Sequence, residues 1–174
     1  VRLIEEHLEK EKSEGRPVEE LILSFHGLPK RRIIEKKDVY YEHCYETYQL
    51  IIDRIQGISK DKIHQCFQSR FGRDEWLTPD TEEYAVDLAK NGKKNIAVYC
   101  PAFLIDCLET TDEIGNELAE AVEEVGGHAT QVTCLNADSL WAKSFGEFLH
   151  SLAFDSRADR NQQYYEVDEK IYES

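Results

Sequence analysis

A histidine at the end of an apolar run is the first residue of this chain that could do chemistry. The stretch LILSFHGLPKR runs from Leu21 to Arg31, and residues suited to a buried strand lead directly into His26, Gly27 and Pro29. Glycine and proline end a strand and begin a loop, so His26 lies where the chain leaves the sheet. A neutral imidazole there could accept a proton or bind a divalent metal. A partly buried histidine with both ring nitrogens bonded to backbone would explain the same pattern.

Carboxylates recur along a second segment, CPAFLIDCLETTDEIGNELAE, which begins at Cys100. A loop after a strand delivers Asp106 and then Glu109, Glu113 and Glu117, whose i, i+4, i+8 spacing places them in one stripe on a helix. Like charges at this spacing cost roughly 0.2–0.5 kcal/mol per pair, and the helix dipole favours only the acids of the first turn. The stripe therefore suits a cation that binds to it or passes along it. A solvated acidic face would have the same spacing.

A third segment, CFQSRFGRDEWLTP from Cys66 to Pro79, places two arginines and a tryptophan in a loop that follows an apolar run. Such loops often carry function. Arg70 and Arg73 could bind carboxylates of a ligand, and Trp76 could offer a flat apolar surface. Local salt bridges and an aromatic lid over the core are the alternative interpretation.

The elements that must position these residues alternate between strand and helix. Strands are expected at 20–26, 62–68, 95–100 and 129–134, and helices at the first residues up to about 15 and at 41–57, 79–92, 106–127 and 137–152. Strands separated by helices pair in parallel through right-handed crossovers, with helices on both faces. We therefore predict an α/β, doubly wound, four-stranded parallel sheet of order 2-1-3-4. That order opens a crevice between strands one and three, where His26 and Glu109 would face each other as proton acceptor and metal ligand.

The composition limits the partners and the compartment. The chain has 174 residues, with 21 basic and 35 acidic side chains and a formal net charge of −14, so nucleic acid is not expected as a partner. Five cysteines without a CxxC pair suit a reducing compartment. No apolar run reaches the roughly 18–20 residues that span a bilayer. We expect a soluble, cytoplasmic protein.

The domain organisation follows from length and from a change in character near the end. We predict one domain over 1–152 and a polar, poorly periodic tail over 153–174. The chain contains no methionine, so we expect Val1 to be a cut point within a longer protein.

Three segments together resemble one family. SFHGLP, FQSRFGRDEWLTP and CPAFLIDCLET are similar, in order and spacing, to the C-terminal half of bacterial ferrochelatase, the lyase of haem biosynthesis that inserts Fe²⁺ into protoporphyrin IX. The segment DVYYEHC, 38–44, resembles an acidic, tyrosine-containing loop of that family. The resemblance covers about 21–152. It implies two similar doubly wound α/β domains with a porphyrin cleft between them, of which this chain would supply one.

The resemblance also implies residue roles. His26 and Glu109 match the catalytic pair of the family. Glu113 and Glu117 match its line of acids on an unusually wound helix, so the implied metal-binding set is His26, Glu109, Glu113 and Glu117. Fe²⁺ would be a substrate rather than a resident cofactor.

Pro29 and Trp76 fall where the family lines its porphyrin pocket. No cysteine follows Cys134, so we expect no iron–sulfur cluster. The N-terminal domain of the family would supply the other cleft wall and any peripheral membrane contact. We therefore expect the 174-residue chain to be inactive alone.

Two other functions stay open at this point. A sirohydrochlorin-type cobalt or nickel chelatase would use the same fold, but typically with two histidines in the metal site, whereas Cys107 lies beside Glu109 here. A non-catalytic module that binds metal or haem is the second alternative.

Overall fold

The computed structural model describes residues 1–154 and divides the chain into two compact units. The first unit is Val1–Asn136, and the second begins at Ala137 and contains helix α7 (Ser139–Phe154). Within α7, the rings of Trp141 and Phe145 stack at a centroid distance of 4.9 Å. Nearly all of the predicted tail lies outside the described residues, and the boundary after residue 152 stays a prediction.

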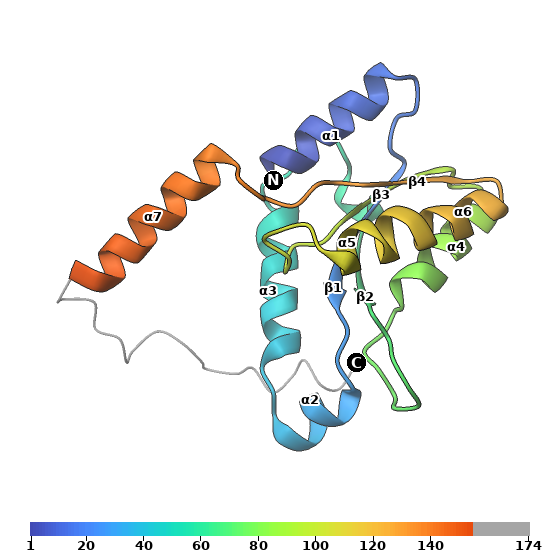
Figure 1. The fold of residues 1–174 in the computed structure, drawn as a ribbon. Coiled ribbons are helices and arrows are strands. Elements are labelled where there is room, and N and C mark those ends of the chain that lie inside the picture. The colour runs from blue at the N-terminus through green and yellow to red at the C-terminus, as the bar shows by residue number, and fades with distance from the viewer. Residues whose placement is uncertain (155–174) are drawn as a thin grey trace. The chain divides into compact units, whose positions relative to one another are not determined.

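The first unit is built on one parallel sheet of four strands. The strands are β1 (Glu20–His26), β2 (Ile63–Gln68), β3 (Asn95–Tyr99) and β4 (His128–Gln131), in the order β2-β1-β3-β4 (Figure 1). The predicted fold class and strand order are confirmed. Because all strands run the same way, their carboxyl ends meet at one edge, with His26 in register with Gln68.

The helices of the first unit are α1 (Arg2–Ser13), α2 (Lys30–Lys36), α3 (Tyr40–Ile52), the 3-10 turn η1 (Lys60–Lys62), α4 (Thr81–Lys90), α5 (Leu108–Thr111), the π-helical segment η2 (Glu113–Leu118) and α6 (Ala119–Glu124). Several predictions need correction. The helix expected over 41–57 ends at Ile52, and the strand expected over 129–134 ends at Gln131. The helix expected over 106–127 is three segments, because the hydrogen bond from Glu117 N–H to the Asp112 carbonyl spans five residues at its centre. Helix α2 was not predicted, and it begins directly after Pro29, whose fixed φ suits a helix start. No helix within residues 1–154 is long and apolar enough to cross a bilayer.

Helices cover both faces of the sheet, as alternation along β1 requires. Leu21, Leu23 and Phe25 belong to the core cluster that contains apolar residues of α1, α2 and α3. Ile22 lies in the other cluster, with residues of α4, η2 and α6. Burial of a large apolar side chain contributes roughly 1.5–3 kcal/mol, so both clusters hold the carboxyl edge rigidly in place.

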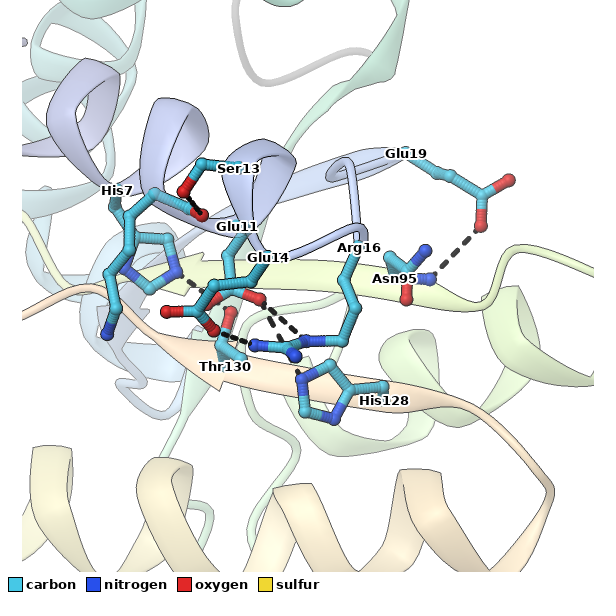
Figure 2. Close-up of polar contacts among 10 residues, drawn as sticks. His7, Glu11, Ser13, Glu14, Arg16, Glu19, Asn95, His128 and Thr130 are labelled. Atoms are coloured by element: carbon cyan, nitrogen blue, oxygen red, sulfur yellow. Dashed lines mark hydrogen bonds and ion pairs between the residues drawn. The ribbon is translucent and has the colours of Figure 1, made fainter.

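Helix α1 is tied to the outer strand by polar contacts (Figure 2). His7 Nε2 and Thr130 Oγ1 of β4 are 2.9 Å apart. Beyond the helix, Arg16 Nε donates to Glu11 Oε2 at 3.1 Å, and the Glu11 residue is only 3% exposed. His128 Nε2 lies 3.9 Å from the same oxygen. The buried acid thus faces a cation, which offsets its loss of hydration.

Candidate functional site

His26 ends β1 with one ring nitrogen engaged. Its Nδ1 lies 2.7 Å from the carbonyl oxygen of Gly27. A carbonyl only accepts, so Nδ1 carries the hydrogen and Nε2 of the neutral ring keeps a lone pair. No hydrogen bond to Nε2 is found within residues 1–154. The backbone carbonyl of His26 accepts from the Tyr40 hydroxyl at 2.7 Å, and the ring lies 6.4 Å from that of Phe103. The histidine is therefore oriented, with a proton-accepting atom available.

Position 27 has no room for a side chain, so only glycine fits there. Its N–H donates to the backbone carbonyl of Gln68 at 2.7 Å, which continues the pairing of β1 with β2. A Cβ at this position would lie 2.7 Å from that same oxygen and 3.2 Å from the Trp76 ring. Backbone cannot yield as a flexible side chain does, so any larger residue would displace the loop that carries His26.

The two predicted substrate-binding residues lie next to each other. Pro29 and Trp76 form an antiparallel bridge, in which Leu77 N–H donates to the Leu28 carbonyl at 3.0 Å. Both residues are half-buried. The loops after β1 and β2 are thus joined, and the Trp76 ring packs close to Gly27.

Glu109 lies in the first turn of α5 and is half-buried. Its pKa is lowered from the ordinary value, first by its own backbone amide, then by a hydrogen bond from the Cys107 thiol, and also by the nearby charge of His26. The last contribution applies to the protonated form of His26, which favours the charged form of Glu109. The carboxylate is ionised and available for a cation at neutral pH.

Asp106 holds the loop that presents α5. Its Oδ1 accepts from Thr110 Oγ1 and Gln131 Nε2, at 3.1 and 2.9 Å, and from Cys134 N–H at 3.3 Å. Its Oδ2 accepts from Asn136 Nδ2 at 2.6 Å. Burial raises the pKa of Asp106, but these hydrogen bonds outweigh it and the pKa is lowered overall. Asp106 is a structural clamp rather than a free acid.

Glu113 is also largely occupied. Ser69 donates to both carboxylate oxygens, through its N–H at 2.5 Å and its hydroxyl at 2.6 Å. Gln68 Nε2 lies 3.4 Å from Oε2. Ser69 has a positive φ of 63°, so a non-glycine residue adopts a left-handed conformation where its backbone turns toward this acid.

The acidic stripe lines a cavity of about 560 Å³ between η2, α4 and the loop after β2. Glu109, Glu113 and Glu117 all line this cavity. Its other lining residues are Gln68, Ser69, Arg70, Phe71, Asp80, Thr81, Glu82, Glu83, Leu108, Asp112, Ile114 and Leu118. Desolvation raises the pKa of Glu82, and the charges of Asp80, Glu117 and Glu113 add to this. The cavity is strongly acidic.

The predicted site residues divide into two groups. His26, Pro29 and Trp76 do not line the acidic cavity, and Glu109 is the residue that relates to both the cavity and His26. Within residues 1–154 no three His, Cys, Asp or Glu side chains gather closely enough to hold a metal ion. The predicted metal-binding roles stay predictions. Arg70 donates to Glu83 at 2.7 Å, which favours the local salt-bridge interpretation.

Sequence reasoning missed several contributors. It gave no role to Gln68, Ser69, Tyr40 or Glu82, which contact the site or line the cavity. Gln68 had a signal, because a polar residue directly after Cys66 and Phe67 in a buried strand needs a partner. The others depend on contacts between distant segments.

The parallel sheet of order 2-1-3-4 defines a doubly wound α/β domain whose switch point lies between β1 and β3. A CbiX protein of cobalamin (vitamin B12) biosynthesis from Marinobacter aquaeolei VT8 has a similar structure, with a TM-score of 0.54. The match covers 79% of this chain and 98% of that one at 11% sequence identity, and therefore concerns the fold alone.

The sequence identifies the family. The ferrochelatase family matches residues 1–152, and the chain belongs to this family. Ferrochelatases from Brucella ovis, Brucella canis and Brucella melitensis biotype 2 are 48% identical to it over 119 residues. Each match covers 68% of this chain and 33% of the relative, so the matched part is about a third of the length of these curated relatives.

Proposed function

We propose that this chain is the C-terminal part of a ferrochelatase that inserts Fe²⁺ into protoporphyrin IX to make protohaem. The observation that carries the proposal is that Nδ1 of His26 faces the Gly27 carbonyl at the end of β1, while Glu109, whose pKa is lowered, lies in the segment that follows β3, the strand beside β1. Membership of the family supports the substrate pair.

The reaction defines what the site must do. Two pyrrole N–H protons leave the macrocycle, one divalent ion enters it, and the ion loses its water ligands. A general base within reach of the N–H groups and an anionic ligand for the ion satisfy both requirements. His26 Nε2 accepts a pyrrole proton, and Glu109 binds the incoming ion or relays the second proton.

The remaining predicted residues serve the two substrates. Pro29 and Trp76 supply a flat apolar surface against which the macrocycle lies, and their bridge keeps that surface rigid. Glu117 and Glu113 line the acidic cavity beyond Glu109 and attract the divalent ion toward it. No iron–sulfur cluster takes part in this scheme.

The test is metal insertion by the complete product of the gene and, in parallel, by the 174-residue chain. Protoporphyrin IX is offered with Fe²⁺ or Zn²⁺, and sirohydrochlorin with Co²⁺ or Ni²⁺, and the metalated products are followed by absorbance and fluorescence. We expect the complete product to metalate protoporphyrin and the chain alone not to turn over, because the proposed cleft needs a second wall from another domain. Turnover confined to sirohydrochlorin would establish the cobalt or nickel chelatase instead. Haem or metal binding without turnover by the complete product would indicate a binding module.

A further inference from the structure

A buried glutamine connects the two sides of the site. Gln68, the last residue of β2, is only 2% exposed. Its backbone carbonyl accepts from Gly27, the neighbour of His26, and its side chain reaches the segment that carries Glu109 and Glu113. It therefore contacts both of the elements that present the proposed catalytic residues.

The hydrogen-bonding capacity of the Gln68 amide is fully used. Oε1 accepts from the Ser24 hydroxyl at 2.7 Å and from the Cys100 thiol at 3.3 Å. Nε2 donates to the Glu109 carbonyl at 2.7 Å and approaches Glu113 Oε2 at 3.4 Å. An amide has two donor hydrogens and two acceptor lone pairs, so none is left over.

The orientation of this amide is fixed by chemistry. The Glu109 carbonyl and the Glu113 carboxylate are acceptors, so only the NH₂ group of Gln68 can face them. The Ser24 hydroxyl, which donates to Gln68 Oε1, also lies 2.8 Å from the Thr81 hydroxyl. Neither Ser24 nor Thr81 is more than 1% exposed, so this part of the network is buried as well. Buried networks with every member satisfied are rigid, and a partly satisfied one is costly.

We propose that Gln68 is the positioning residue that sets the place of Glu109 relative to His26. Its Nε2 holds the α5–η2 junction at the Glu109 carbonyl, while its own carbonyl holds the His26 loop through Gly27. The expected effect of Gln68 on turnover rests on the proposed function. Its role in holding the segment that carries Glu109 does not. Misplacement of a reacting group by about 1 Å can cost about 100-fold in rate.

The variant that tests this is Gln68→Glu in the complete gene product. The substitution keeps the shape and the acceptor toward Ser24, but an ionised carboxylate cannot donate to the Glu109 carbonyl and repels Glu113. We expect kcat to fall by about 10- to 100-fold with the KM for porphyrin unchanged within about twofold. As the pH falls, protonation of the new carboxyl restores one O–H donor, so kcat relative to the unaltered protein should recover. Loss of packing alone would give no such recovery.

Gln65→Glu is the matched control, because it makes the same change in the same strand. The Gln65 side chain lies on the opposite face of β2, and its Nε2 is buried without a hydrogen-bond partner among the residues described. We expect it to lower stability while kcat per folded molecule stays unchanged and shows no recovery in acid.

Hydrogen–deuterium exchange separates this inference from the proposed function. Amides of 108–118 should exchange faster in Gln68→Glu than in Gln65→Glu, whether or not the protein inserts metal. If the unaltered protein has no chelatase activity, the proposed function fails and exchange alone decides the structural role of Gln68. Equal exchange at 108–118 in both variants would overturn the inference, as would an unchanged kcat in Gln68→Glu.

Discussion

His64 and His26 lie at opposite ends of the same sheet and have different surroundings. His64, near the start of β2, uses both ring nitrogens, with Nε2 2.9 Å from Glu20 Oε2 and Nδ1 3.0 Å from the Tyr84 hydroxyl. His26, at the end of β1, uses Nδ1, toward the Gly27 carbonyl, and its Nε2 has no hydrogen bond within residues 1–154. A histidine with both nitrogens bonded orders its neighbours, whereas one with a lone pair to spare can take a proton.

The acidic residues at the two ends of the sheet also differ in whether they have basic partners. At the amino end, Glu20 is 4% exposed and is matched by Lys93 Nζ at 3.0 Å as well as by His64. Burial raises the pKa of Glu20, but the hydrogen bonds from His64 and Lys93 outweigh it and the pKa is lowered. The cavity at the carboxyl end has many more acids than bases. Matched charges stabilise the scaffold, and unmatched acids suit a passing cation.

The sharpest test of this contrast removes each imidazole in turn from the complete gene product. We expect His26→Ala to lower chelatase turnover by about 10²- to 10⁴-fold, because it removes the proposed general base. Its urea midpoint should stay close to that of the unaltered protein, since His26 makes one side-chain hydrogen bond. Metal insertion and equilibrium unfolding measure the two effects.

His64→Ala is the matched control for that experiment. It removes a partner of buried Glu20, so we expect a loss of about 1–3 kcal/mol in the free energy of unfolding and no change in turnover per folded molecule. Full turnover in His26→Ala, or a selective catalytic loss in His64→Ala, would break the contrast.

A second test asks whether the close packing around Gly27, at the carboxyl end of the sheet, holds the His26 loop in place. Gly27→Ala places a Cβ 2.7 Å from the Gln68 carbonyl, so we expect a loss of about 1–3 kcal/mol in stability and a marked loss of turnover as the His26 loop moves. Gly146→Ala in α7 meets nothing within 4 Å and should be neutral or stabilising. Circular-dichroism melts and the insertion assay measure both variants. Unaltered turnover in Gly27→Ala would mean that the loop position is not critical.

Much of the fold follows from sequence because it depends on local pattern. The strand ELILSFH is predicted with the bounds of β1, Glu20–His26, since its apolar run ends at punctuating residues. Alternation with helices then fixes parallel pairing and the edge at which His26 lies. Helix α2 is missed because its KRRIIEK sequence is mostly charged, and only Ile33 is buried.

The site was only partly predictable, for a physical reason. The positions of His26 and Glu109 follow from where their strands end. The Gln68 network depends on contacts between residues 32 or more apart, such as Gln68 with Cys100 and with Glu109, which no local pattern encodes. The π-helical segment η2 has a local hydrogen bond from Glu117 N–H to the Asp112 carbonyl, which the apolar spacing of the sequence does not distinguish from an α-helix. The unusual winding entered only through the resemblance to ferrochelatases.

A third test asks whether Asp106, whose carboxylate accepts four hydrogen bonds, belongs with the scaffold. Asp106→Asn removes the charge that four donors share, so we expect a loss of about 1–2 kcal/mol in stability at pH 7. The lowered pKa of Asp106 means that the unaltered protein has this contribution at neutral pH and loses it as the pH falls through the folded-state pKa, below the ordinary 3.8. The difference between the two proteins in urea midpoint should therefore shrink in strong acid. A constant difference would show that the charge is not responsible.

The smallest expected effect comes from the unmatched acids themselves. The pKa of Glu82 is raised, first by desolvation and then by Asp80, Glu117 and Glu113. An acid with a raised folded-state pKa favours the folded state below its unfolded pKa, and this benefit is lost as the pH rises through the folded value. Glu82→Gln should therefore raise stability at pH 7 by about 0.5 kcal/mol, and the gain should vanish near pH 4. Glu124→Gln, an exposed acid outside the cavity lining, is the control. If Glu82→Gln destabilises the protein at pH 7, these acids are matched after all, and charge pairing does not distinguish the two ends of the sheet.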